Sequence, residues 1–153
     1  MEKVFLSLGS NLGDRKKNII SAIKLLKKIK DIKVEKLSKI IETKPWGNEK
    51  QPKFKNAVLK IDTKLEPMQL LLIIKGIEKT LGRKLSKIKW GPRIIDIDIL
   101  LYGKKKIKNR MLEIPHPHMH ERLFVLEPFA EISPRTMHPV KKKTIKKLLD
   151  EIK

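Results

Sequence analysis

The sequence of 153 residues contains no cysteine, which excludes disulfide bonds, thiolate catalysis and cysteine-ligated zinc. It also lacks any apolar run near the eighteen or so residues that a membrane-spanning helix needs. Residues 1–8 pass directly into an apolar stretch, without the basic region, long apolar segment and cleavage site of a secretory signal. We therefore expect a cytoplasmic protein with no membrane partner.

Acidic and aromatic residues are both scarce. Asp and Glu number 17 against 37 Lys and Arg, which gives a formal net charge of +20, and aromatics make up 5%. Such a charge can indicate an anionic partner, namely nucleic acid, an acidic membrane surface or a polyphosphate. It can also reflect a lysine-rich proteome, and the spread of lysine along every segment favours this second interpretation.

Arginine departs from this pattern, because there are only six and four of them lie between residues 83 and 122. The planar guanidinium group binds phosphate through two parallel hydrogen bonds, which lysine cannot do. The region from 83 to 122 is therefore the first place to look for a phosphate site.

Hydrophobic residues make up 40% of the chain, enough for the core of one domain spanning residues 1–153. Apolar alternation predicts strands at residues 4–8, 34–43, 54–63 and 94–102. Helical spacing predicts helices at about 14–30 and 67–81, a short helix at 122–126 and a closing helix at 144–152. A hairpin should lead from the last strand into a short strand near Ile107. This order predicts an α+β fold: a ferredoxin-like βαββαβ core with an antiparallel sheet, helices packed on it, and loops that cover ligands.

The segment 94–102 carries the most informative pattern. Alternation directs four apolar side chains into the core: Ile95, Ile97, Ile99 and Leu101. Asp96 and Asp98 then project together from the opposite face, about 7 Å apart at the backbone. Their like charges repel unless cations lie between them, and two divalent ions about 4 Å apart would fit. The alternative is a half-exposed strand whose two aspartates are simply solvated.

Cationic residues flank these aspartates in the sequence. Gly82-Arg83 and Trp90-Gly-Pro-Arg93 enclose a loop with three lysines: Lys84, Lys87 and Lys89. These cations could clamp a polyphosphate, or the segment could be a solvated basic loop. The chain has no Gly-x-x-x-x-Gly-Lys-Ser/Thr motif, which excludes a P-loop fold.

Histidines alternate at positions 116, 118 and 120, but the intervening proline and the absence of helical spacing argue against a transition-metal site. His116, with Arg122 six residues later, is a better candidate for a phosphate contact. Phe54 and Asn56 could offer a stacking ring and an amide to a flat heterocycle. Equally, Phe54 could belong to the core and Asn56 to a strand edge.

Together these segments resemble the 6-hydroxymethyl-7,8-dihydropterin pyrophosphokinase family over nearly the whole chain. The matching blocks are Gly9-Ser-Asn-Leu-Gly13, Glu42-Thr-Lys-Pro-Trp-Gly47, Phe54-Lys-Asn-Ala57, Glu78 with Gly82-Arg83, the run from Trp90 to Ile99, and Ile114-Pro-His-Pro117 with the run from Arg122 to Leu126. The resemblance implies a folate-biosynthesis enzyme that transfers diphosphate from ATP to the hydroxymethyl group of the dihydropterin and releases AMP.

The resemblance also implies the role of each residue. Two Mg²⁺ ions would be held by Asp96 and Asp98. ATP, the co-substrate, would be bound by Glu78, Trp90, Arg93, His116 and Arg122. The pterin would lie between Phe54 and Phe124, with the edge of its ring against Asn56, Thr43, Pro45 and Trp46. The catalytic cations would be Arg83, Lys89 and Arg93, and the loops 44–53 and 83–91 would close over the reactants.

Some positions depart from the family pattern. Leu85 and Lys89 stand where well-known members carry arginines, Lys75 replaces a glutamine, and Arg110 is one position out of register. These departures leave the details of ATP binding open.

Two other functions are compatible with the fold. A nucleic-acid-binding module would need exposed aromatics on its sheet, and the scarcity of aromatics argues against one. An ATP-binding relative could act on a different hydroxymethyl heterocycle. We expect a monomer without a nucleic-acid partner.

Overall fold

The computed structural model describes residues 1–43, 50, 52–82 and 93–153. In chain order its elements are β1 (Glu2–Ser10), α1 (Arg15–Lys27), β2 (Ile32–Leu37), β3 (Ile41–Thr43), β4 (Phe54–Thr63), α2 (Pro67–Thr80), β5 (Asp96–Tyr102), β6 (Ile107–Lys108), β7 (Glu113–Ile114), the 3₁₀-helix η1 (Met119–Glu121), α3 (Leu123–Ile132) and α4 (Ile145–Ile152). Among these described residues, no helix combines the length and the apolar character needed to cross a bilayer.

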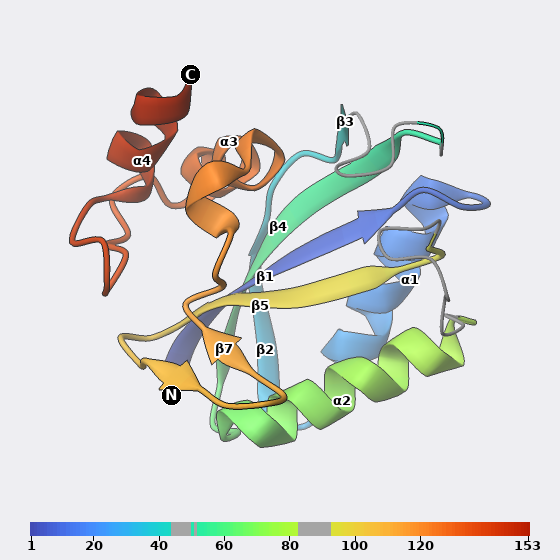
Figure 1. Cartoon of the computed structure of the whole chain (residues 1–153). Coiled ribbons are helices and arrows are strands. Elements are labelled where there is room, and N and C mark those ends of the chain that lie inside the picture. Colours follow the sequence, from blue (N-terminus) through green and yellow to red (C-terminus); the bar gives the residue numbers. More distant parts are fainter. Residues whose placement is uncertain (44–49, 51, 83–92) are drawn as a thin grey trace.

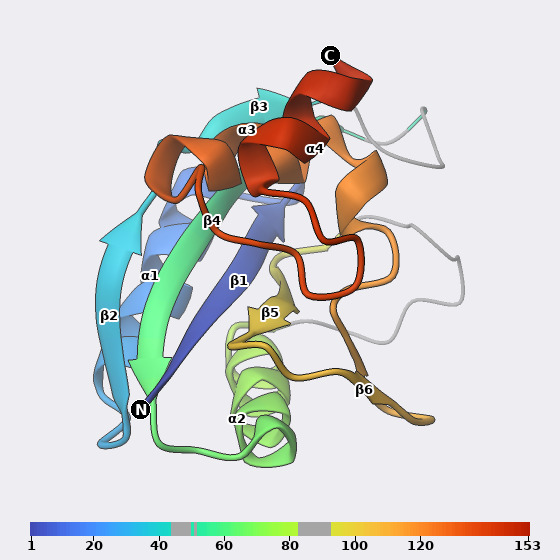
Figure 2. The same cartoon turned by 90° about the vertical axis from the view of Figure 1, so that its left-hand side faces the viewer.

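The main sheet has the strand order β2-β4-β1-β5, with β3 paired to β4, and all of these pairings are antiparallel. The connection β1-α1-β2-β4-α2-β5 is the βαββαβ arrangement, so the predicted α+β, ferredoxin-like fold is confirmed. Figure 1 shows α1 and α2 on one face of the sheet and α3 and α4 on the other, and the turned view in Figure 2 agrees.

Both faces of the sheet are therefore buried, by two separate cores. Alternation along β1 sends Val4, Leu6 and Leu8 to the core under α1 and α2. It sends Phe5 to the core under α3 and α4, where its ring stacks on that of Phe129 with a centroid distance of 4.4 Å.

Strand β5 follows the predicted alternation only as far as Ile99. Its pairing with β1 shifts there, so that Leu6 lies opposite Ile99 and Phe5 opposite Leu101, which leaves Leu100 as an extra residue. Leu101 is buried as expected, but this bulge places it in the α3/α4 core. The prediction that it shares a face with Ile95, Ile97 and Ile99 is wrong.

Three boundaries also differ from the prediction. The strand expected at 34–43 is divided into β2 and β3 around Ser38, whose Oγ accepts the main-chain N–H of Val58 at 2.9 Å. The short strand at Ile107 forms, but it pairs with β7 and not with β5. Helix α3 extends to Ile132, well beyond the predicted end at residue 126.

Candidate active site

Strand pairing brings the predicted aspartates and the predicted heterocycle contact into one row. Gly9 on β1 lies opposite Asp96 on β5 and also opposite Asn56 on β4. Ser7, two residues earlier, lies opposite Asp98. Because side chains alternate between faces, Asp96, Asp98 and Asn56 share the face that α3 and α4 cover.

The environment of Asp98 favours a bound cation. Burial, together with the charges of Asp96 and Glu78, raises the pKa of its carboxyl to about 7, although Arg122 and Lys75 act against the rise. A divalent cation beside the pair would offset both the burial and the repulsion. Magnesium prefers oxygen ligands and is held by one or two carboxylates together with substrate phosphates, so this donor set fits magnesium.

Glu78 of α2 is hydrogen-bonded to strand β5. It is buried in α2, and its Oε2 accepts a hydrogen bond of 2.8 Å from the main-chain N–H of Ile97, the residue between the two aspartates. Its Oε1 lies 3.7 Å from Nζ of Lys75, which pairs an exposed cation with the buried carboxylate. Lys75, a departure from the family pattern, thus adds positive charge next to the aspartate pair.

Arg122 lies at the start of α3, and the structure places its charge beside the aspartates. Burial lowers the pKa of its guanidinium, while Asp98 and Asp96 act in the opposite direction and keep it charged. The side chain is buried, and its Cζ is 5.6 Å from the centroid of the Phe124 ring. Arg122 and Phe124, which are both predicted site residues, are therefore in contact.

The main chain of His116 is hydrogen-bonded to strand β5. Its N–H donates to the carbonyl of Leu100 at 3.0 Å, and its Nδ1 accepts the N–H of His118 at 3.1 Å. Burial, and then the charge of Arg122, lower the pKa of the ring to about 4, so the ring is neutral at pH 7. With Nδ1 acting as an acceptor, the proton lies on Nε2, and His116 offers a neutral N–H donor beside Arg122.

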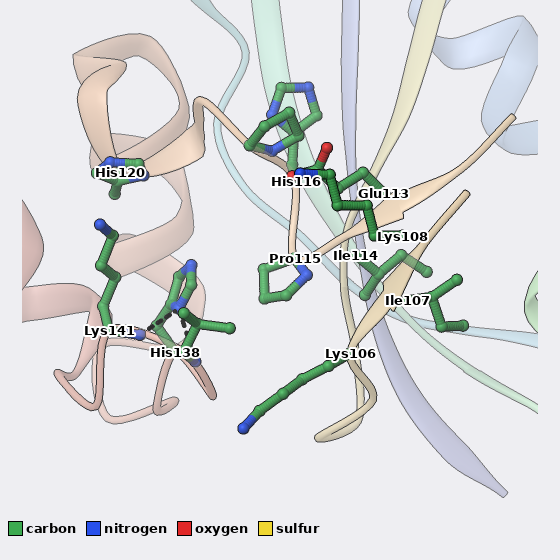
Figure 3. A pocket seen from close by; sticks show the side chains of 12 residues that line it. Lys106, Ile107, Lys108, Glu113, Ile114, Pro115, His116, His120, His138 and Lys141 are labelled. Atoms are coloured by element: carbon green, nitrogen blue, oxygen red, sulfur yellow. Dashed lines mark hydrogen bonds between the residues drawn. The ribbon is translucent and has the colours of Figure 1, made fainter. Parts of the chain in front are cut away.

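Two of the three alternating histidines, His116 and His120, line one cavity together with His138. A hollow of about 340 Å³ separates His116 from His120 and His138, as Figure 3 shows. His138 Nδ1 accepts the N–H groups of Val140 and Lys141 at 3.2 and 3.0 Å, which makes it a structural cap for that turn. Within the described residues there is no group of three or more His, Cys, Asp or Glu arranged to bind a metal.

On the heterocycle side, Asn56 is held by its neighbours. Its Nδ2 donates to Oγ1 of Thr43 at 2.6 Å, and Thr43 on β3 lies opposite Phe54 in the sheet. A Cβ at Gly9 would be 2.8 Å from Oδ1 of Asn56 and 3.5 Å from Cδ1 of Phe54. Phe54 and Asn56 therefore lie over Gly9, and only glycine leaves room for them there.

Asn11 is a site residue that the sequence did not single out. It is buried, and its Oδ1 accepts the N–H of Arg93 at 2.7 Å, while its own N–H donates to the carbonyl of Arg93 at 3.0 Å. Its Nδ2 donates to the carbonyl of Pro52 at 3.1 Å. Asn11 thus connects the predicted phosphate contact Arg93 to Pro52, just before strand β4 begins at Phe54. Its place in the block Gly9-Ser-Asn-Leu-Gly13 could have identified it.

The structure describes ten of the predicted site residues, and the strand pairings, hydrogen bonds and charge interactions given above connect them. These are Thr43, Phe54, Asn56, Glu78, Arg93, Asp96, Asp98, His116, Arg122 and Phe124. The other predicted site residues, and the departure at Leu85, lie outside the described residues: Pro45, Trp46, Arg83, Lys89 and Trp90.

Comparison with known proteins identifies the family. The model of the 7,8-dihydro-6-hydroxymethylpterin-pyrophosphokinase (HPPK) family matches residues 5–134. The chain belongs to this family. The prediction of the family and of the enzyme class is therefore confirmed: the protein is a pyrophosphokinase of folate biosynthesis that uses ATP as co-substrate and binds a pterin.

Curated relatives include single pyrophosphokinases and longer proteins. The chain is 46% identical over 151 residues to 2-amino-4-hydroxy-6-hydroxymethyldihydropteridine pyrophosphokinase of Aquifex aeolicus (strain VF5), covering 99% of this chain and 92% of that protein. It is 45% identical over 128 residues to the enzyme of the same name from Bacillus subtilis (strain 168), covering 84% and 76%. It is 51% identical over 139 residues to the folic acid synthesis protein fol1 of Pneumocystis carinii, covering 91% of this chain but only 18% of the relative.

Solved structures support the fold of the pyrophosphokinase. The crystal structure of wild-type Plasmodium falciparum HPPK-DHPS with pteroate superposes with a TM-score of 0.77 at 18% identity, covering 98% of this chain and 42% of that one. At this identity the similarity supports the fold alone.

Proposed function

We propose that this pyrophosphokinase transfers the diphosphate of ATP to the hydroxymethyl group of 6-hydroxymethyl-7,8-dihydropterin and releases AMP. The row Asp96–Gly9–Asn56 carries this proposal, because it joins a cation site to a heterocycle site across one strand. The reaction needs a polyphosphate and a flat ring held side by side, and adjacent strands of one sheet hold both without a hinge between them.

The aspartates would hold the metal. Asp96 and Asp98 would bind two Mg²⁺ ions, which would neutralise phosphate charge when bound. The raised pKa of Asp98 supports this assignment, since a cation between the carboxylates would offset both of its main causes, burial and the repulsion by Asp96.

The cations and donors around the aspartates would bind ATP. Arg122 and the neutral Nε2–H of His116 would donate to phosphate oxygens, and Asn11 would keep Arg93 oriented toward the same group. Glu78 would act mainly through the backbone of Ile97, and Trp90 would complete the ATP site. The catalytic cations would be Arg83, Lys89 and Arg93.

The pterin would lie over Gly9. Phe54 and Phe124 would stack on its faces, and Asn56 would form hydrogen bonds with its edge in an orientation that the bond to Thr43 fixes. Pro45 and Trp46 would complete this side. We further propose that residues 1–153 act as one catalytic domain, as a monomer in the cytoplasm and without nucleic acid.

An assay of AMP release tests the proposal. The protein is incubated with ATP, Mg²⁺ and 6-hydroxymethyl-7,8-dihydropterin, and AMP formation that depends on the pterin is measured. Asp96→Ala and Asp98→Ala should each lower the rate by roughly a hundredfold or more, as removal of a main electrostatic contact does. The control is Asp150→Ala, which removes an exposed carboxylate of α4 and should leave the rate unchanged. A silent wild-type protein, or full activity in both site variants, would refute the proposal.

A further inference from the structure

The sheet face that carries the aspartates has a second hollow at its other end. Its volume is about 460 Å³, and its floor includes Phe5 and Leu101, which lie opposite each other on β1 and β5. Lys60 on β4 lies opposite Phe5, so the three residues form a row across the sheet. In Figure 1 the segment between α3 and α4 lies near the N-terminal end of β1, away from the end of β5 where Asp96 begins the strand.

Four lysines line this cavity: Lys3, Lys60, Lys104 and Lys142. None of its lining residues carries a carboxylate. Lys3 has a distant partner in Asp62, with Nζ and Oδ1 3.9 Å apart, and the carboxylate of Glu2 lies beside Gly103 at the rim. Across the described part of the chain, the other three lysines have no carboxylate within 4.0 Å. The cavity therefore carries an excess of positive charge.

Lys60 is the most informative of the four. It is half-buried on an inner face of the sheet, two residues from the buried Val58 of the α3/α4 core. Alternation along β4 would favour an apolar residue there, and lysine instead keeps a cation at the edge of this core. This placement makes sense if the cation has an anionic partner that is not part of the chain.

Lys142 approaches the cavity from the opposite side, in a backbone conformation that is uncommon for lysine. Its φ of 57° makes it the one non-glycine residue with positive φ within the described ranges. Glycine would fit this position with less strain. The turn itself would favour glycine, so we attribute the lysine at this position to the contacts of its side chain in the cavity.

The remaining lining residues suggest what the partner looks like. The apolar lining residues are Phe5, Leu101 and Pro139, which are buried, and Met137, which is exposed. The hydroxyl groups of Ser133 and Thr136, 2.5 Å apart, add hydrogen-bonding groups. The volume suits a small molecule. Several cations around one apolar hollow match a doubly charged group attached to an apolar body.

We propose that this cavity binds a phosphate monoester with an aromatic or aliphatic body, at a site separate from the pyrophosphokinase site. The phosphate would lie among Lys60, Lys104 and Lys142, and the apolar body would lie against the exposed side chain of Met137. The site would remain intact if the proposed reaction chemistry were wrong, because it shares none of the residues assigned to that reaction.

Isothermal titration at low ionic strength tests the proposal, with 1-naphthyl phosphate as the probe. A non-hydrolysable ATP analogue with Mg²⁺ is present at saturation, so that the pyrophosphokinase site is occupied. We expect 1-naphthyl phosphate to bind at least tenfold more tightly than either inorganic phosphate or 1-naphthol. Equal affinity for 1-naphthyl phosphate and for either of the other two probes would overturn the proposal, as would binding of 1-naphthyl phosphate only when the ATP analogue is left out.

Variants locate the site. Lys60→Met removes a charge but keeps an apolar stem, and Lys142→Gly removes a charge at a position that glycine fits without strain. The double variant should bind the probe at least tenfold more weakly, with a melting temperature that is not lowered and with unchanged AMP formation. The control is the double variant Lys24→Met/Lys27→Met, in α1 on the opposite face of the sheet, which removes the same two charges from the +20 total and should change affinity less than twofold. Equal losses in the two double variants would show general attraction to a basic protein and no site.

Discussion

Replacing Gly9 with alanine tests how closely the sheet holds the heterocycle site. The new Cβ would lie 2.8 Å from Oδ1 of Asn56, where ordinary van der Waals contact begins at 3.4 Å. Asn56 must therefore move. It is buried, and its Nδ2 is bonded to Oγ1 of Thr43 at 2.6 Å, so any movement that relieves the contact also strains this hydrogen bond.

The expected cost follows from these two effects. An off-rotamer side chain costs about 0.5–1.5 kcal/mol, and a buried polar group that loses its partner costs about 1–3 kcal/mol. If Asn56 binds the pterin edge, we expect Gly9→Ala to weaken pterin binding by about 1–3 kcal/mol, or roughly 5- to 150-fold in Kd. The metal and phosphate contacts lie on β5 and α3, so the affinity for ATP should change much less.

Isothermal titration with the pterin, in the presence of a non-hydrolysable ATP analogue and Mg²⁺, measures this change. Gly76→Ala is a matched control, because a Cβ there meets nothing within 4 Å. It should raise the free energy of unfolding by up to about 1 kcal/mol, since alanine favours a helix more than glycine does, and leave pterin binding unchanged. Wild-type pterin affinity in Gly9→Ala would refute the assignment of Asn56 to the pterin.

Two further predictions concern charge and loop anchoring. The folded-state pKa of Asp98, about 7, lies above its ordinary value of 3.8, so the native metal-free protein binds an extra proton between these values and loses stability as pH rises through them. The free energy of unfolding is measured as a function of pH by urea unfolding in EDTA. Asp98→Asn should make its fall with pH shallower by up to about 1.4 kcal/mol per pH unit. Identical slopes in the two proteins would contradict the raised pKa. His116 and His138 contribute an opposite slope, because their pKa values are lowered, but they are present in both proteins. Asn11→Ala should lower the free energy of unfolding by about 1–3 kcal/mol and speed amide exchange at Arg93, because it leaves that N–H without its acceptor; unchanged exchange at Arg93 would refute the anchoring role.

How well the sequence predicted each element depended on how local its determinants were. Strand β4 was predicted residue for residue, because alternation is clean from Phe54 to Thr63 and both ends carry polar turn residues. The bulge in β5 could not be predicted, since Ile99, Leu100, Leu101 and Tyr102 are all apolar and suit either core. Periodicity loses its meaning where both faces of a sheet are buried.

The same reasoning applies to the site. Asp96 and Asp98 were predicted as a pair from two-residue spacing alone. Arg122 was noted beside His116 as a candidate phosphate contact, but only the family resemblance implied that it shares a site with the aspartates, because no local pattern links α3 to β5. Asn11 was missed because its partners Arg93 and Pro52 are 82 and 41 residues away. Its local pattern is that of an ordinary turn after a strand, which a glycine-rich segment already explains.

The geometry of the sheet also explains how one basic chain can hold a metal site and a cationic cavity on the same face. Asn56, in the row of Asp96, and Lys60, in the row of the cavity, are four residues apart on β4, which corresponds to about 13 Å along the strand. That separation exceeds the screening length of about 8 Å at physiological salt, so the cavity lysines do not neutralise the aspartates through solvent. Among the described residues, the positive charges that act on Asp98 are those of Arg122 and Lys75, which reach it from α3 and α2. Within this part of the protein, a cation at Asp98 therefore competes with two specific side chains and not with the lysines of the cavity.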